Sequence, residues 1–301
     1  MLESDLLDRV LASTTITSDV FFAGAPCGEW RMANADSAGI GATFHLVLEG
    51  EAWMHLCDGN SAPRRLARGD IAFLPRNALH VLTDSAQPPE TIDTRVDSVS
   101  PAAQAGDGAV VVCGKLQLDA DAQRFLLAPL PEIVVLPTAD VAAPSIAGAI
   151  VTTMWQQVRG PVPALSVTLN KLADVLVVEI LRDAVRRKLV ASGVFAGLAD
   201  PQLRRALIEV LRRPEQPWSV DGLAAAAAMS RSTFATRFQA VVGSSPLQFL
   251  REWRMRRAQM LLRDGRSVAD VAAQVGYESE VAFAKAFKRV IGVGPGAVRR
   301  H

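Results

Sequence analysis

Cysteine is scarce in this chain, and its spacing excludes two common structural roles. The 301 residues contain three cysteines, Cys27, Cys57 and Cys113. An odd number of cysteines without a CxxC pair argues against a disulfide framework and against a structural zinc site. We therefore expect reduced thiols.

Long apolar runs are missing too, although half of the residues are hydrophobic. No stretch of about 18 uncharged apolar residues occurs, which excludes an obvious membrane-spanning helix. The N-terminus carries Glu3, Asp5 and Asp8 in place of the basic segment that opens a secretion signal. The sequence thus predicts a soluble cytoplasmic protein with no membrane partner, and its length favours two domains.

A strong overall charge is also lacking, because the formal net charge is +1 at pH 7. The charge is nevertheless uneven along the chain. Residues 200–301 contain 17 Lys and Arg against 9 Asp and Glu, about +8, whereas the preceding residues contain 15 against 22, about −7. A basic domain of this size is typical of proteins that bind the phosphate backbone of nucleic acid.

Two different patterns occupy the acidic part of the chain. Between about residues 40 and 118, short alternating segments separated by turn signals such as Asp58-Gly59-Asn60 predict a compact antiparallel β unit. Beyond Leu136, apolar residues recur every three or four positions: Leu165, Leu169, Leu172, Leu176 and Ile180. They predict a helix whose apolar face either packs on the β unit or joins two copies of the chain through heptad-like contacts.

An internal repeat of about 48 residues fills the basic domain. Its two copies share residue types at matched positions: Phe234, Phe238, Gly243 and Pro246 in the first, Phe283, Phe287, Gly292 and Pro295 in the second. Ser219 and Ser267 suit helix N-caps, the two glycines suit helix C-termini, and phenylalanines four residues apart hold a helix on its core. Each copy therefore predicts two helices joined by a tight turn, a helix-turn-helix.

A longer helix is predicted between the two copies, from Leu247 to Leu262, with Ser245 as its cap and Pro246 as its first residue. Such a helix is about 24 Å long. It separates the two recognition helices by roughly the spacing of successive major-groove faces, about 34 Å. Both copies can then contact one side of one DNA duplex.

The region from about residue 203 to 300 resembles the DNA-binding domain of the AraC/XylS family. The motif from Gly243 to Leu250 is similar to the family's first copy, and Gly276-Tyr277 followed by the second set of matched residues is similar to its second copy. Val298 departs from the family, which usually has an aromatic residue there. The resemblance implies a sequence-specific transcription regulator, more often an activator than a repressor, that binds double-stranded promoter DNA as a homodimer and contacts RNA polymerase.

The resemblance also implies roles for individual side chains. By position, base contacts would come from Arg231, Ser232, Ala235 and Thr236 in the first copy and from Glu280, Val281, Ala284 and Lys285 in the second. These side chains are chemically able to read base edges. Phosphate contacts would come from Arg237, Arg254, Arg257, Lys288 and Arg289, for which the alternative is a solvated basic face.

The segments 44–50 and 69–80 resemble the two motifs of cupins. The resemblance implies a barrel that serves as an effector pocket, with His45 and His80 in it. Two imidazoles without a third ligand make a poor metal site, so we expect no metal, no cofactor and no enzyme activity, with a metal-dependent cupin enzyme as the alternative. Oxidation of Cys27 or Cys113 is a second way to sense a signal. The alternative for Cys113, which lies in an apolar strand, is a simple packing role.

The expected fold is α+β. It comprises an N-terminal cupin-like antiparallel β-barrel over residues 1–136, a helical linker over 137–199 that is a possible dimerisation helix, and an all-α domain over 200–301 with two helix-turn-helix units. The predicted partners are promoter DNA and a small-molecule or oxidant effector.

Overall fold

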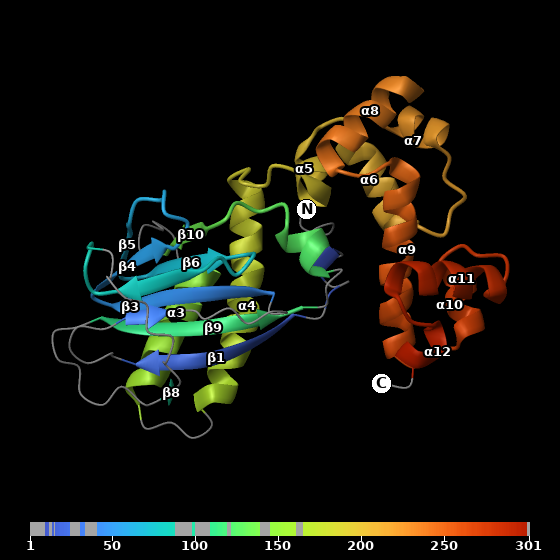
Figure 1. Ribbon diagram of the computed structural model, residues 1–301. Helices are drawn as coiled ribbons and strands as arrows, with labels where there is room; N and C mark the ends of the chain where they lie inside the picture. The colour runs from blue at the N-terminus through green and yellow to red at the C-terminus, as the bar shows by residue number, and fades with distance from the viewer. Residues whose placement is uncertain are drawn as a thin grey trace. The chain divides into compact units, whose positions relative to one another are not determined.

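The computed structural model describes residues 10, 11, 14, 16–24, 31–33, 41–87, 98–99, 109–118, 122–138, 145–160 and 165–299. The chain divides into two compact units (Figure 1). The N-terminal unit is Ile16–Leu189, and the C-terminal unit is Met1–Thr15 together with Val190–His301. Among the residues that the structure describes, no helix combines the length and apolar character needed to span a membrane.

Two β-sheets form the N-terminal unit. The strands are β1 (Thr17–Gly24), β2 (Arg31–Ala33), β3 (Ala42–Glu49), β4 (Glu51–Leu56), β5 (Arg64–Ala67), β6 (Asp70–Leu74), β7 (His80–Thr83), β8 (Ser98–Val99), β9 (Val110–Gln117) and β10 (Val134–Pro137). One sheet has the order β10-β6-β3-β9-β1-β8 and the other β2-β7-β4-β5. The pairings are antiparallel except for the short parallel pairing of β1 with β8, which confirms the predicted antiparallel β unit.

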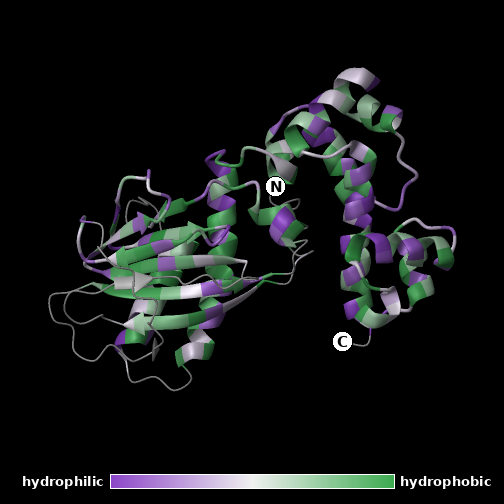
Figure 2. Ribbon diagram, in the orientation of Figure 1, coloured by the Kyte–Doolittle hydropathy of each residue, from purple (hydrophilic) through white to green (hydrophobic). Residues whose placement is uncertain are grey.

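Helices cover part of this β structure. The π-helix η1 (Gln123–Leu127) precedes β10, and α3 (Ile146–Arg159) and α4 (Leu165–Arg186) follow it. Seven of the eight residues of β3 are buried, so both faces of this strand are covered. One face belongs to a core that includes Val47, Leu74 and Val111, and α3 contacts the strand as well. Figure 2 shows hydrophobic residues concentrated in the strands.

The apolar face of α4 packs on its own β unit. Leu169, Leu176 and Ile180 are at most 1% exposed, and α4 contacts β1, β10 and α3. Two polar side chains of α4 also bind backbone amides of the edge of β1. The N–H of Ser18 donates to Asp174 at 2.6 Å, and that of Val20 donates to Asn170 at 2.8 Å. These contacts satisfy donors that the ladder with β9 leaves unused.

The predicted boundaries differ from these two units. The sequence predicted a separate helical linker over residues 137–199, whereas the structure assigns the part up to Leu189 to the N-terminal unit and the rest to the C-terminal unit. The physical reason is that the apolar face of α4 is buried against the sheet. Helices α3 and α4 therefore belong to the same core as the strands and do not form a separate linker. A helical periodicity alone does not reveal which surface it covers.

The C-terminal unit is helical throughout the residues that the structure describes. Its helices are α5 (Gly193–Ala199), α6 (Leu203–Arg212), α7 (Val220–Ala226), α8 (Arg231–Val242), α9 (Pro246–Arg263), α10 (Val268–Gln274), α11 (Glu280–Ile291) and α12 (Pro295–Val298). Within this unit, α7 and α8 lie near one end of α9, and α10 and α11 pack along its other half (Figure 1). The predicted pair of helix-turn-helix units on a connecting helix is thereby confirmed.

Candidate nucleic-acid interface

Serine caps begin the helices of both helix-turn-helix units at matched positions. The capping residues are Ser219, Ser230, Ser267 and Ser279. The Oγ of Ser219 accepts from the N–H of Gly222 at 3.1 Å, and the Oγ of Ser267 accepts from the N–H of Asp270 at 3.1 Å. Each bond satisfies a backbone donor that the first turn leaves without a partner, and thereby fixes where the helix starts.

The phenylalanine pairs hold the second helix of each unit on its core in nearly the same geometry. The ring centroids of Phe234 and Phe238 are 5.5 Å apart with an interplanar angle of 56°, and those of Phe283 and Phe287 are 5.5 Å apart at 52°. All four side chains are at most 1% exposed. Because both pairs fix the buried face of their helix, they also fix which face α8 and α11 present to solvent.

Matched glycines end the two second helices. Gly243 and Gly292 both adopt left-handed backbone with a φ of 86°. Glycine takes this conformation without the steric cost that a Cβ brings. The connecting helix α9 then begins with Ser245 as cap and Pro246 at its first position, as the sequence predicted.

The turn of the second unit packs against a loop of the first. Gly276 has a φ of 80°, and a Cβ at this position would stand 2.3 Å from the carbonyl oxygen of Glu215. Glu215 belongs to the loop between α6 and α7. The contact joins backbone to backbone, so the turn of the second unit lies directly against the segment that leads into the first.

Arg254 of α9 fastens the same loop. Its Nε donates to the carbonyl of Pro214 at 2.6 Å, and its Nη2 donates to the carbonyl of Gln216 at 2.8 Å. The guanidinium carbon also lies 5.9 Å from the ring centre of Tyr277, within the range of a cation–π contact. Burial lowers the pKa of Arg254. The sequence predicted a phosphate contact here, but these inward partners favour a structural clamp, which spacing along the chain could not reveal.

Arg237 has an inward partner as well. Its Nε and Nη2 donate to one carboxylate oxygen of Asp200 at 2.9 and 2.7 Å. Burial alone would raise the pKa of Asp200, but hydrogen bonds from the Leu203 N–H and from Arg237 lower it. The pair ties α8 to the start of α6, which favours positioning of the recognition helix over the predicted phosphate contact.

The predicted base-reading side chains lie on the outward face of α8 and α11. Six of the eight are exposed, and the two alanines are half-buried. Arg231 is 68% exposed and pairs with the equally open Asp221 at 3.0 Å, an ion pair that water weakens. Val281 is 65% exposed, an unusual position for a large apolar side chain and a suitable one for a thymine methyl group.

One further side chain belongs to this surface. Gln239 is exposed on α8 one turn beyond Ala235. In the repeat, its position is equivalent to that of Lys288 in α11. A glutamine amide can bind the edge of adenine through two hydrogen bonds. Gln239 is not among the residues predicted above to contact bases, although extending the repeat by one helical turn identifies it.

The remaining predicted phosphate contacts differ in their surroundings. Lys288 and Arg289 are exposed in the last turn of α11, where cations also suit the helix dipole. The Nη1 of Arg257 lies 3.9 Å from a carboxylate oxygen of Glu215, and its side chain is 37% exposed. Lys288 and Arg289 are therefore better placed than Arg257 to bind DNA phosphates.

The two histidines predicted in the effector pocket are buried and hydrogen-bonded to each other. Their Nε2 atoms are 2.6 Å apart, and His80 Nδ1 donates to the carbonyl of Ala78 at 2.6 Å. His80 thus holds its proton on Nδ1, and His45 donates to it. Burial lowers the pKa of both rings, and a positive charge on His80 would lower that of His45 further. The Nδ1 of His45 is buried, and no residue that the structure describes forms a hydrogen bond with it.

The cysteine environments oppose a thiolate where the structure describes them. Cys113 is fully buried in the core between the strands, and burial raises the pKa of its thiol. Cys57 is exposed, and its pKa is also raised, by partial burial and by Asp58. Oxidation requires an accessible thiolate, so packing is the favoured role of Cys113. The second predicted redox residue, Cys27, lies outside the described residues.

Within the described ranges, no three His, Cys, Asp or Glu side chains are grouped so that they could hold a metal ion. His55, the third histidine of the β unit, bonds instead to Thr83 at 2.9 Å and to the carbonyl of Ser85 at 3.0 Å.

Comparison with known proteins gave matches over nearly the whole chain. Residues 5–186 match a family described as Cupin, and residues 223–301 match a family described as Helix-turn-helix domain. A Streptomyces lividans protein with the name of an AraC-like transcription regulator is 37% identical over 86% of both chains. The transcriptional regulator MtrA of Neisseria gonorrhoeae is 31% identical over 99% of this chain and 98% of its own. The crystal structure of the AdpA DNA-binding domain in complex with a target DNA shares 40% identity, covers 34% of this chain and 91% of its own, and has a TM-score of 0.32.

Proposed function

Because this chain belongs to the AraC family of DNA-binding transcription regulators, with a cupin domain on its N-terminal side, we propose that it activates transcription from the promoters to which it binds. The observation that carries the proposal is the pair of geometrically matched helix-turn-helix units on α9, each with its outward helix exposed. The resemblance of these units favours activation through contact with RNA polymerase. The relatives favour this function over a metal-dependent cupin enzyme.

Both units contribute side chains that contact base edges, and α11 also contributes phosphate contacts. On α11, Glu280, Val281 and Lys285 offer an acceptor, an apolar contact and a donor, which together distinguish bases in the major groove. On α8, Arg231 and Gln239 supply the long polar side chains. Lys288 and Arg289 position the domain on the backbone without reading sequence.

The signal enters through the N-terminal unit. A small molecule is favoured over oxidation of Cys113 or Cys57, because Cys113 is buried and the pKa of both thiols is raised, while Cys27 keeps an oxidant as the alternative. Binding would shift the population of the form that engages the operator and RNA polymerase. The protein would carry out this role in the cytoplasm, where promoter DNA lies.

A second copy of the chain would complete the assembly through α4. Besides its buried face, α4 exposes two apolar side chains, with Val167 60% and Val175 47% exposed. Large exposed apolar side chains on one helix favour a protein contact. We expect the full chain to sediment as a dimer and Val175→Glu to sediment as a monomer; a wild-type monomer at all concentrations would contradict homodimerisation.

Transcription in vitro tests the proposed activation. The template would be a promoter fragment that the full-length protein selects from genomic DNA, and the reaction would contain RNA polymerase from a related bacterium. We expect more transcript with the wild-type protein than without it, and a smaller increase with Lys285→Ala at the same protein concentration. The control Lys171→Ala changes a lysine of the N-terminal unit that is 73% exposed and should activate normally. A fall in transcript on addition of wild-type protein would overturn activation in favour of repression.

A further inference from the structure

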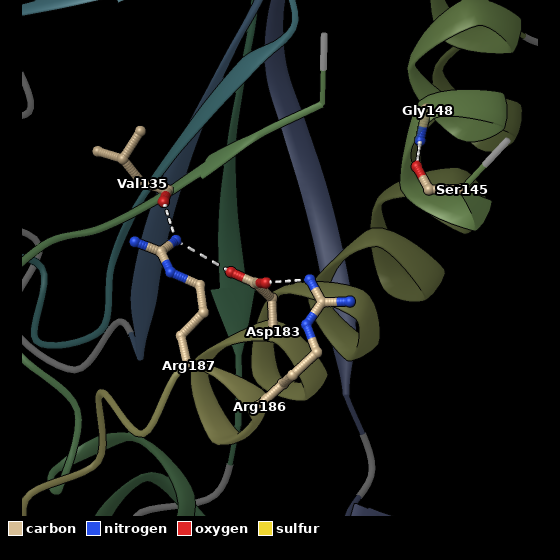
Figure 3. A network of polar contacts seen from close by, with 6 residues as sticks. All are labelled: Val135, Ser145, Gly148, Asp183, Arg186 and Arg187. Atoms are coloured by element: carbon tan, nitrogen blue, oxygen red, sulfur yellow. Dashed lines mark hydrogen bonds and ion pairs between the residues drawn. The ribbon is translucent and has the colours of Figure 1, made fainter. Parts of the chain in front are cut away.

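A cavity of about 390 Å3 opens in the N-terminal unit where three elements meet. Its walls are the end of β10, the start of α3 and the C-terminal half of α4, and Figure 3 shows the polar contacts around it. Volumes of this size are typical of sites for small ligands. Nothing in the DNA-binding role uses this cavity.

The charged side chains of the cavity carry an excess of one positive charge. They lie on the C-terminal half of α4 and on the residue that follows it: Glu179, Arg182, Asp183, Arg186 and Arg187. Glu179 pairs with Arg182 at 2.6 Å. Asp183 faces two guanidinium groups, so the three arginines exceed the two carboxylates by one. An anion with a single charge would balance the site.

Asp183 fixes two of these guanidinium groups in place. It is 5% exposed, accepts from Arg186 at 2.5 Å with one oxygen and from Arg187 at 3.1 Å with the other (Figure 3). Arg187 also donates to the carbonyl of Val135 at 2.8 Å. The side chain of Arg186 is 79% exposed, so most of its five N–H donors face solvent. Asp183 therefore orients the guanidinium of Arg186 through one N–H group, and the other N–H groups can bind a ligand.

The uncharged part of the wall comprises three apolar residues and the polar Thr138 and Ser145. Leu136 and Ala147 are 7% and 6% exposed, and Pro137 lies beside them. The start of α3 adds the partial positive charge of a helix N-terminus, with Ser145 as its cap. An arginine-rich side opposite a hydrocarbon side matches a molecule that is anionic at one end and apolar at the other.

We propose that this cavity binds a small organic monocarboxylate as the effector of the protein. The carboxylate would bind Arg186, whose planar guanidinium matches two carboxylate oxygens, and the hydrocarbon part would lie on Leu136, Pro137 and Ala147. This inference rests on the proposed function, because it names the signal to which the regulator responds.

The cavity lies next to the last residues of the N-terminal unit. Helix α4 ends at Arg186, and Lys188 has a φ of 55°, a left-handed conformation that is sterically costly for a residue with a Cβ. The N–H of Leu189, the last residue of the unit, donates to the carbonyl of Ala184 at 2.9 Å. A ligand that bridges Arg186 and the start of α3 would stabilise this strained helix end.

Ligand-observed NMR on the full-length protein tests the inference. The probes are 3-phenylpropionate and hexanoate, and their amides serve as neutral controls of nearly equal shape. Arg186→Gln removes the open guanidinium, while Arg187 still pairs with Asp183. Arg65→Gln is the matched control, since Arg65 forms an exposed ion pair with Glu51 elsewhere in the same unit. We expect saturation transfer from the acids to the wild type and to Arg65→Gln, and a loss of affinity of about tenfold or more in Arg186→Gln.

The same proteins are then titrated with operator DNA, with and without the acid that binds best. A change in DNA affinity on adding the acid to the wild type, absent in Arg186→Gln, would support the effector role. Equal binding of acids and amides, or equal binding by wild type and Arg186→Gln, would overturn the proposed site. Absence of acid binding with intact DNA binding would refute this inference alone, whereas absence of DNA binding would refute the proposed function.

Discussion

Ala228 and Gly276 occupy equivalent turn positions in the two helix-turn-helix units, and both have left-handed backbone, with φ of 55° and 80°. Only the second turn has a neighbour that forbids a side chain, the backbone of Glu215 at 2.3 Å from a Cβ at Gly276. The first turn tolerates alanine at a modest steric cost. The repeat therefore has one adaptable turn and one turn that is fixed against the opposite unit.

This difference predicts that substitutions at the two turn positions change stability by unequal amounts. Gly276→Ala should destabilise the C-terminal unit by more than about 2 kcal/mol, because the Cβ meets backbone as well as an unfavourable φ. Ala228→Gly should change stability by less than about 1 kcal/mol, because relief of strain opposes the greater flexibility of the unfolded chain. Denaturant unfolding gives the free energies, and hydrogen exchange of α10 and α11 locates the effect. Equal losses in the two variants would contradict the packing of Gly276 on Glu215.

The salt dependence of DNA affinity distinguishes a structural role of Arg254 from a phosphate contact. Arg254→Ala should lower stability by roughly 1 to 3 kcal/mol, since it leaves the carbonyls of Pro214 and Gln216 without their charged donor. The slope of log affinity for DNA against log salt should stay at the wild-type value. Arg251→Ala, an exposed residue on the same helix, controls for the loss of one charge. A slope reduced by about one in Arg254→Ala would restore the phosphate contact that the sequence predicted.

Lys285 and Lys288 should separate base reading from phosphate binding on one helix. Lys285→Ala should cost about 1 to 3 kcal/mol on the preferred operator and relax the preference at one base pair. Lys288→Ala should weaken binding to all sequences alike and reduce the salt slope by about one. Binding measured on a set of operators with single base-pair changes distinguishes the two patterns. A uniform loss in Lys285→Ala would make Lys285 a phosphate contact.

The histidine pair predicts that acid destabilises the N-terminal unit. Burial lowers the pKa of His45 and His80 below the usual value of about 6.5. The unfolded chain therefore takes up protons that the folded chain does not as the pH falls below about 6.5, and stability falls with it, by up to about 1.4 kcal/mol per pH unit for each proton.

Denaturant unfolding between about pH 7 and 5.5 measures this dependence above the usual carboxylate range. The double variant His45→Leu, His80→Leu replaces both partners of the hydrogen bond by apolar side chains and should fold. Its stability should vary less with pH than that of the wild type. An unchanged slope in the double variant would show that other groups bind the protons.

Local patterns made much of the C-terminal unit predictable. Caps, left-handed glycines and phenylalanine pairs act within a few residues, so the spacing of Ser267, Phe283 and Gly292 was sufficient to place a helix-turn-helix. The same holds for the turns and strands of the β unit. Such signals are read from the chain without knowing what it touches.

Contacts between distant residues could not be predicted in this way. Arg254 and Pro214 are forty residues apart, and Arg237 and Asp200 are thirty-seven apart, so both arginines looked like surface cations. The face of α4 was readable as apolar, but its partner strand β1 lies about 150 residues earlier. The arginine-lined cavity depends on three elements meeting and has no signature in the sequence.

Sequence reading by the outward faces of α8 and α11 can be measured by a fluorescence anisotropy titration of the full-length protein. The titration compares an operator selected from genomic DNA with a shuffled duplex of equal composition. We expect affinity for the operator at least about a thousandfold above that for the shuffled duplex, with a steep loss between 50 and 200 mM salt, roughly tenfold or more. Equal affinity for both duplexes from a folded protein would contradict sequence-specific regulation by these helices.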